Sequence, residues 1–246
     1  MKYNGIRRAK FIDRPNRFIA NVELDGKREK VHVKNTGRCK EIFVEGTTVI
    51  LEEGINSNRK TRYSIIGGYK GDLLINTDSQ APNTVVYEAI TQNKIDGLQD
   101  VTKIKREATF GNSRFDIYFE DKDRKGFIEV KGVTLEYDGM CMFPDAPTQR
   151  GARHVHELIE AKRQGYHSYI IFLVQMEGVK CFTPNHGMDP EFGRALKAAH
   201  SQGVEILVYD SLVREDEIVI GDSLDFILEM PGVALNDIEG EKDDEN

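Results

Sequence analysis

Two carboxylates and a lysine stand at a spacing that could hold a metal ion. Asp116 lies in an alternating segment, residues 115–119, and Glu129 and Lys131 lie in a second one, residues 127–133. Acidic groups among strand residues of buried type are costly unless a cation neutralises them. Mg²⁺ prefers oxygen ligands from one or two carboxylates, completed by waters. The pattern therefore predicts a divalent metal, Mg²⁺ or Mn²⁺, bound by Asp116 and Glu129 with Lys131 beside it.

The segment between these two strands is typical of a hairpin turn, because residues 120–126 are mostly charged and end in glycine. If Glu120 pairs with Lys125 across a four-residue loop, Asp116 falls opposite Glu129. Opposite residues of an antiparallel pair point to the same face, and so does Lys131, two positions after Glu129. The alternative is the solvated face of an ordinary hairpin, which needs no metal.

An Asp followed by Glu-x-Lys on the adjacent strand resembles the metal-binding core of the PD-(D/E)xK nuclease superfamily. The resemblance implies phosphodiester hydrolysis with Asp116, Glu129 and Lys131 as catalytic residues. A divalent metal would activate water and stabilise charge on the phosphoryl oxygens, and Lys131 would orient that water or stabilise the developing charge. The resemblance also implies that Glu88, on a preceding helix, is a further acidic member. The alternative for Glu88 is an exposed carboxylate near a helix start, favoured by the helix dipole.

Helical spacing predicts a helix from about residue 148 to residue 164, with one apolar face. The residues expected on its buried side are Ala152, Val155, Leu158 and Ile159. Arg150 and His154 are four residues apart and share another face. Superfamily relatives place polar pairs near the scissile phosphate, so the resemblance implies that Arg150 and His154 contact nucleic acid. The alternative for His154 is a plain surface position.

Longer motifs follow one another in order from about Val31 to about Asp210. They include Val31–Arg38, Asn58–Thr61, Asn76–Thr77, Pro82–Asn83, Glu88–Ile90, Gly111–Asp116, Glu129–Leu135, Met142–Thr148 and Arg150–His154. Together they resemble the sugar fermentation stimulation protein A family. The resemblance implies an N-terminal OB-like β-barrel that binds DNA, joined to a C-terminal PD-(D/E)xK nuclease-like domain.

The order of the expected elements favours the α/β class (α+β overall) with a mixed sheet in the second part. Residues 1–80 contain short strands and a tight turn at Asp25-Gly26, as expected of a small OB-like barrel. Residues 81–235 are expected to form the nuclease-like α/β domain, and residues 236–246 an acidic, disordered tail. We also expect a short helix within residues 35–45. Another helix is expected around residues 85–90, capped by Asn83 or Thr84.

The distribution of charge predicts where nucleic acid binds. The net charge is −7, but residues 1–70 hold 16 Lys and Arg against 8 Asp and Glu, and the remainder holds 18 against 33. This asymmetry matters more for phosphate binding than the total. The predicted contacts in the basic part are Arg38, Arg59, Lys60 and Arg62. The alternative is a basic surface without a partner.

Composition narrows the class of protein. The three cysteines are odd in number and lack metal-ligand spacing, so we expect reduced thiols and a cytoplasmic protein. No apolar run has the length of a membrane span, and no secretory signal is evident. The expected function is DNA binding with a Mg²⁺-dependent nuclease site. The alternatives are a non-enzymatic DNA-binding or regulatory protein of sugar metabolism that retains the nuclease scaffold, or an RNA-processing protein. The oligomeric state stays open, a homodimer included.

Overall fold

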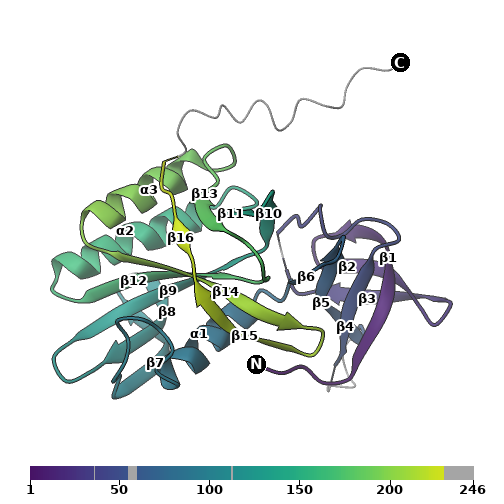
Figure 1. Ribbon diagram of the computed structural model, residues 1–246, viewed down its shortest axis with the longest axis horizontal. Helices are drawn as coiled ribbons and strands as arrows, with labels where there is room; N and C mark the ends of the chain where they lie inside the picture. Colours follow the sequence, from purple (N-terminus) through teal and green to yellow (C-terminus); the bar gives the residue numbers. More distant parts are fainter. Residues whose placement is uncertain (36, 55–59, 112, 230–246) are drawn as a thin grey trace.

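The computed structural model describes residues 1–35, 37–54, 60–111 and 113–229 of the chain. A small all-β domain at the N-terminal end packs against a larger domain that carries the helices (Figure 1). The two are joined directly, because the last strand of the first domain ends at Asn76 and the first helix begins at Ala81.

The N-terminal domain is a closed barrel. Its strands are β1 (Ile6–Asn16), β2 (Ile19–Leu24), β3 (Lys27–Val33), β4 (Thr48–Glu53), β5 (Tyr63–Lys70) and the short β6 (Leu73–Asn76). They run in the order β3-β2-β1-β4-β5-β6, and a further pairing of β3 with β5 closes the barrel. The turn between β2 and β3 has φ of 52° at Asp25 and 73° at Gly26, as a two-residue hairpin turn requires. The predicted OB-like barrel is confirmed.

The second domain is built on a mixed sheet. Its elements are α1 (Ala81–Thr91), β7 (Lys103–Phe110), β8 (Ser113–Glu120), β9 (Lys125–Val133), β10 (Leu135–Tyr137), β11 (Met140–Phe143), α2 (Gln149–Arg163), β12 (His167–Val174), β13 (Cys181–Pro184), α3 (Pro190–Ser201), β14 (Glu205–Arg214), β15 (Glu217–Ser223) and β16 (Asp225–Phe226). The main sheet has the order β15-β14-β12-β9-β8-β7, and β9, β12 and β14 are parallel to one another. The predicted mixed-sheet fold is confirmed.

Helices cover both faces of this sheet (Figure 1). Helix α2 packs on β12, β9 and α3, while α1 packs on β9 and β15. A smaller sheet, β10-β11-β13-β16, lies beside α3. Apolar residues on the two faces form two separate cores, and both continue into the barrel.

A buried polar network holds the barrel against the second domain. The Asn76 amide N–H donates to the Gln175 carbonyl at 2.9 Å, and Gln175 Nε2 donates to Asn76 Oδ1 at 2.8 Å. Asn76 Nδ2 in turn donates to the Tyr3 hydroxyl at 2.9 Å. Lys70 of β5 also forms an ion pair with Glu136 of β10 at 2.6 Å. Hydrogen-bonded buried groups of this kind fix one relative orientation of two packed bodies.

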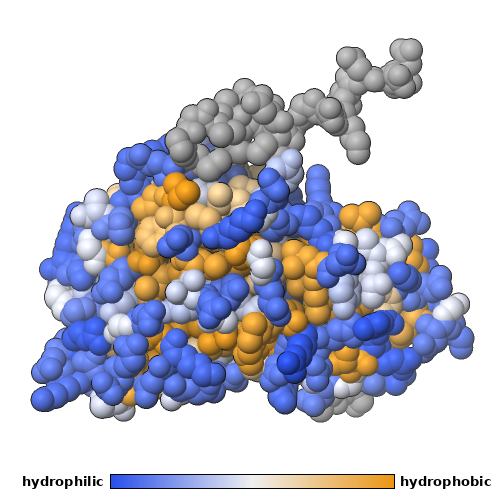
Figure 2. Space-filling view, in the orientation of Figure 1, coloured by the Kyte–Doolittle hydropathy of each residue, from blue (hydrophilic) through white to orange (hydrophobic). Residues whose placement is uncertain are grey.

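The hydropathy of the surface differs between the ends and the middle of the molecule. Figure 2 shows hydrophilic side chains over both ends of the viewed face and apolar ones across its middle, where the two domains meet.

Two local predictions were wrong. Within the described part of residues 35–45 the chain forms turns rather than a helix, because Cys39 has φ of 45° and its carbonyl accepts from the amides of both Ile42 and Phe43. Helix α1 begins at Ala81 after Gln80, with Pro82 in its first turn, so neither Asn83 nor Thr84 is the cap. Proline favours the first turn of a helix because it lacks the N–H that would be unpaired there. Asn83 is therefore inside the helix, with its side chain available for another partner.

Candidate functional site

The hairpin between β8 and β9 has the predicted register. Glu120 lies opposite Lys125, and the pairing continues to Ile117 opposite Ile128. One further step in the same register would place Asp116 opposite Glu129. The alternating apolar positions and the glycine at Gly126 thus set the register of the hairpin as far as Ile117 and Ile128.

Strand β8 is irregular at Asp116, where the paired ladder with β9 ends. Phe115 packs in the core below α2, whereas Ile117 belongs to the core below α1. Residues two apart on a regular strand would share one face. Glu107 lies opposite Asp116 on β7 and has φ of 55°, so the neighbouring strand is irregular at the same level.

The Asp116 carboxylate supplies a hydrogen-bond acceptor where the ladder between β8 and β9 ends. Its Oδ2 accepts the Val130 N–H at 2.8 Å, in place of a backbone carbonyl, and its Oδ1 accepts from Asn83 Nδ2 at 2.7 Å. Burial and the charge of Glu129 raise the pKa of Asp116 to about 6, against the hydrogen bonds from Val130 and Asn83 and the charge of Lys131, which lower it. A carboxyl group in this position binds a proton or a cation more readily than an exposed one.

Glu129 is the most buried member of the cluster, with 2% of its surface exposed. Its Oε1 lies 2.5 Å from Lys131 Nζ and 2.5 Å from His154 Nδ1. Burial alone would raise the pKa of Glu129, but the His154 hydrogen bond and the Lys131 charge outweigh it and lower the pKa. Its Oε2 is buried and has no hydrogen-bond partner among the residues that the structure describes. Such an orphaned oxygen is costly and calls for a ligand such as an ion or water.

His154 lies in the interior rather than at a plain surface position, and its contact with nucleic acid stays a prediction. It is 4% exposed, on the face of α2 that covers Glu129. The Arg150 Nε–H donates to His154 Nε2 at 3.3 Å. His154 Nε2 is thus an acceptor, and we assign the proton to Nδ1, where it is donated to Glu129. His154 therefore orients Glu129, while Arg150 is exposed and remains a predicted phosphate contact.

Glu88 is not brought into this cluster. Its side chain is on α1 and 42% exposed, and its Oε2 accepts from the Met1 ammonium at 2.8 Å. The acidic site in the structure therefore consists of Asp116 and Glu129.

The donor set fits a hard divalent cation. Two carboxylates, one with an orphaned oxygen, supply the number of protein ligands that Mg²⁺ commonly takes. Across residues 1–35, 37–54, 60–111 and 113–229, no group of three or more His, Cys, Asp and Glu side chains is arranged to hold a metal. Waters and substrate oxygens would have to complete the coordination of an ion at Asp116 and Glu129.

The predicted basic residues of the barrel differ in their surroundings. Arg38 and Lys60 are exposed, and neither forms an ion pair with another described residue. Arg62 is also exposed, but its Nε donates to Glu53 Oε1 at 2.8 Å. Arg59 lies outside the described residues.

Arg14 organises the basic loops of the barrel, a role the sequence did not reveal. Its guanidinium donates to the backbone carbonyls of Arg17, Asn35, Gly37 and Arg38 at 2.7–2.9 Å. The backbones of Arg17 and Arg38 are thereby held close to the same guanidinium. Arg17, which was not predicted as a contact, is exposed like Arg38.

A polar groove lies between the barrel and the second domain. Its volume is about 400 Å³, and its lining residues come from both domains and the segment between them. Asn35 and Gly37 line it from the barrel, and Gly132, Thr148 and Gln175 line it from the second domain. Gly132 directly follows Lys131 in β9, whereas Asp116, Glu129 and Lys131 themselves are not among the described residues that line the groove.

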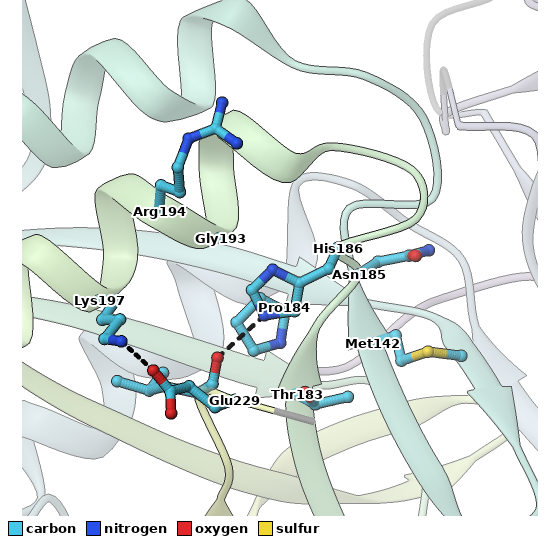
Figure 3. A pocket seen from close by; sticks show the side chains of 10 residues that line it. Met142, Thr183, Pro184, Asn185, His186, Gly193, Arg194, Lys197 and Glu229 are labelled. Atoms are coloured by element: carbon cyan, nitrogen blue, oxygen red, sulfur yellow. Dashed lines mark hydrogen bonds and ion pairs between the residues drawn. The ribbon is translucent and has the colours of Figure 1, made fainter. Parts of the chain in front are cut away.

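A second cavity, of about 470 Å³, is lined by residues of β11, β13 and α3 (Figure 3). His186, Arg194 and Lys197 line it, but His186 Nε2 binds the Leu228 carbonyl and Lys197 pairs with Glu229. Asp116, Glu129 and Lys131 are not among its lining residues.

Among the described residues, the chain has no helix with both the length and the apolar character needed to cross a membrane.

Comparisons with known proteins agree with the fold and identify relatives. Residues 12–77 match the family model of the SfsA N-terminal OB domain, and residues 80–217 match that of the sugar fermentation stimulation protein RE domain. The chain is 53% identical over 230 residues to a sugar fermentation stimulation protein homolog of Alkaliphilus oremlandii, covering 92% of this chain and 98% of the relative. It is 57% identical over 219 residues to a homolog from Clostridium botulinum, covering 89% of this chain and 95% of the relative.

A solved structure gives the same result in three dimensions. The structure of Pyrococcus furiosus SfsA in complex with Ca²⁺ superposes with a TM-score of 0.85 at 28% sequence identity. The match covers 92% of this chain and 98% of the archaeal chain.

Proposed function

Because the chain belongs to the sugar fermentation stimulation protein family, we propose that it is a DNA-binding protein whose second domain hydrolyses phosphodiester bonds with a divalent metal. The observation that carries the proposal is the convergence of Asp116, Glu129 and Lys131, with the orphaned Oε2 of Glu129 among them. The archaeal relative, which is described in complex with Ca²⁺, supports a divalent cation as ligand.

Asp116 and Glu129 are the residues that would hold Mg²⁺ or Mn²⁺. When bound, the metal supplies Lewis acidity and lowers the pKa of a coordinated water. Asp116 is kept in place by Val130 and Asn83, and Glu129 by His154. Both carboxylates are therefore pre-oriented before any ligand arrives, which reduces the cost of ordering them.

Lys131 carries the positive charge nearest to the two carboxylates. Its Nζ lies on Glu129 Oε1, and its side chain is 15% exposed. A buried ammonium at this position stabilises negative charge that develops on a phosphoryl oxygen, and it can orient a water by donating a hydrogen bond. Arg38 on the barrel and Arg150 on α2 are both exposed, so they are the cations that would bind the phosphates of a nucleic-acid strand and position it.

A second function is favoured by one observation. Lys131 and His154 both contact Glu129 Oε1, so that oxygen is fully satisfied by the protein itself. An oxygen used in this way contributes less to metal binding, which favours a protein that keeps the nuclease scaffold and binds nucleic acid without cleaving it.

Labelled single- and double-stranded DNA, incubated with Mg²⁺, Mn²⁺ or EDTA, tests the proposal. We expect metal-dependent cleavage by the wild-type protein that is lost in Asp116→Asn and Glu129→Gln. The exposed Asp123→Asn, in the loop of the same hairpin, serves as the matched control. Cleavage that is equal in EDTA, or unchanged in Asp116→Asn, contradicts the site assignment. Binding without cleavage under all conditions supports the non-enzymatic function, and the same assays with RNA test an RNA-processing role.

A further inference from the structure

The groove between the two domains is lined by Gly132, the residue that follows Lys131 in β9. Its floor is formed by Gly132, at the carboxyl end of β9, and Gln175, directly after β12. A Cβ on Gly132 would lie 2.6 Å from Pro82 Cγ, and the residue after Pro82 is Asn83, which binds Asp116. Gly132 of the groove is thus next in sequence to Lys131 on β9, and it lies against Pro82, the residue before Asn83 on α1. Ligands of open α/β sheets commonly lie in such a crevice beyond the carboxyl ends of parallel strands.

The groove is lined mainly by uncharged polar groups. Asn35, Ser79, Thr134 and Gln175 contribute amides and hydroxyls. Gln175 Nε2 is used by Asn76 and by the Asp78 carbonyl, whereas no hydrogen bond links its Oε1 to a described residue. Amides and hydroxyls match the donors and acceptors on the edge of a nucleobase.

The groove has few charged groups. Arg17 and Asp145 are the charged side chains among the described lining residues, and Asp145 Oδ2 already accepts the Arg38 N–H at 2.9 Å. Arg38 is thereby held to the loop that leads into α2, because Asp145 lies between β11 and the start of the helix at Gln149. Three arginines that form no ion pair with described residues, Arg17, Arg38 and Arg150, thus belong to the segments that surround the groove. Their guanidinium groups can bind the phosphates on either side of a base in the groove.

The size of the groove restricts what can enter. A volume of about 400 Å³ is that of a small-ligand pocket. It accommodates a single nucleotide but no base pair within a stacked duplex. A base inside it must therefore be unpaired and unstacked.

We propose that the interdomain groove binds one unpaired nucleotide beside the scissile phosphate, so that the site acts on single-stranded nucleic acid or on unpaired ends. This inference rests on the proposed function and names its substrate class. The buried network at Asn76 and Gln175 keeps the two walls of the groove at a fixed separation.

Two substitutions that fill the groove test the proposal. Ala146→Trp acts from the loop before α2, and Ser79→Trp acts from the exposed position that precedes α1. Ser201→Trp, at the exposed end of α3, is the matched control, because Ser201 Oγ donates to a nearby carbonyl as Ser79 Oγ does. Only variants whose melting temperature shows that they fold are used in the binding and cleavage assays. One folded filling variant, either Ala146→Trp or Ser79→Trp, is enough to test the proposal.

The first readout is binding in EDTA, where no metal-dependent turnover occurs. The probes are a short single-stranded DNA with 2-aminopurine at one position and its blunt duplex. We expect the wild type and Ser201→Trp to bind the single strand and to change the fluorescence of the probe. The filling variants should bind it about tenfold more weakly, because the contacts of one base are lost. Single-strand binding and fluorescence that remain unchanged in a folded filling variant overturn the proposal.

The second readout is cleavage in Mn²⁺, which separates this inference from the proposed function. We expect the wild type to cut the single strand, or the unpaired end of a duplex, at least about tenfold faster than blunt duplex. Equal cleavage of blunt duplex overturns the groove proposal and leaves the nuclease proposal intact. If no substrate is cut but the filling variants still lose single-strand binding, the groove proposal stands and the nuclease proposal fails.

Discussion

The buried carboxyl group of Asp116 predicts an unusual dependence of stability on pH in the metal-free protein. Its pKa is raised from 3.8 to about 6 by burial and by the charge of Glu129. Between these two values the folded state binds more protons at this site than the unfolded state does. The free energy of unfolding therefore falls as the pH rises through this window, which is opposite to the usual behaviour of an ion-paired carboxylate.

The size of the effect follows from the shift. One pKa unit corresponds to about 1.4 kcal/mol, so a shift of roughly two units corresponds to about 3 kcal/mol. Asp116→Asn has no titrating group at this position and lacks this contribution. The wild type should thus lose about 2.5 kcal/mol relative to Asp116→Asn between pH 4 and pH 7.5, because the unfolded carboxyl group is already partly ionised at pH 4. At neutral pH the repulsion between the two carboxylates is absent in the variant, which offsets the hydrogen bonds that the substitution disturbs.

Urea unfolding in EDTA, followed by circular dichroism at a series of pH values, measures this difference. The chain has no tryptophan, and the described helices all belong to the second domain, so the helical signal reports the domain that contains Asp116. Asp123→Asn should follow the wild type at every pH. Adding Mn²⁺ should stabilise the wild type and leave Asp116→Asn unchanged, because a ligand stabilises only a protein that binds it. A difference between wild type and Asp116→Asn that stays constant with pH would refute the description of Asp116 as a buried, acid-paired group.

Three further predictions address the other residues of the site. Lys131→Ala should reduce the cleavage rate by about 10²-fold or more while metal and DNA binding persist; a lower melting temperature with no change in rate would instead show a structural role. Arg38→Ala should reduce the slope of log K for DNA binding against log salt concentration by about 0.7–0.9. Arg62→Ala should change this slope less, because Glu53 already pairs with Arg62. Equal changes of slope in fluorescence-anisotropy titrations would contradict this ranking. His154→Ala removes a hydrogen bond to a buried carboxylate and should lower the free energy of unfolding by about 1.5–3 kcal/mol. It should also weaken Mn²⁺ binding in calorimetric titrations. Unchanged Mn²⁺ affinity would show that Glu129 is oriented without His154.

The register of the β8–β9 hairpin could be predicted from the sequence because it depends on local signals. Apolar residues alternate on both strands, and the loop is charged and ends in Gly126. A shift by one residue would have turned every buried side chain to the wrong face. The buried side of α2 was predictable for the same reason, and Ala152, Val155, Leu158 and Ile159 are all buried.

The role of His154 could not be predicted because it depends on contact between distant elements. A histidine four residues after an arginine is equally expected on a helix surface. Its burial becomes evident when α2 is packed over β9, which brings Glu129 to 2.5 Å from the imidazole. The strands β13 and β16 were missed for a related reason, since two to four residues are too few to show a period.

The connection between barrel and sheet explains why one chain combines these two domains. Arg38, the barrel residue predicted to bind phosphate, is tied through its backbone to Asp145 at 2.9 Å, and Asp145 precedes the helix that carries Arg150 and His154. His154 contacts the Glu129 carboxylate, so a continuous series of contacts links the basic loop of the barrel to the proposed metal ligand. Loose attachment of the barrel would allow binding and cleavage positions to vary relative to each other. Under the proposed function, the fixed interface would place a nucleic-acid strand bound to the barrel at one distance from Asp116 and Glu129, which is the condition for positioning a phosphate for attack.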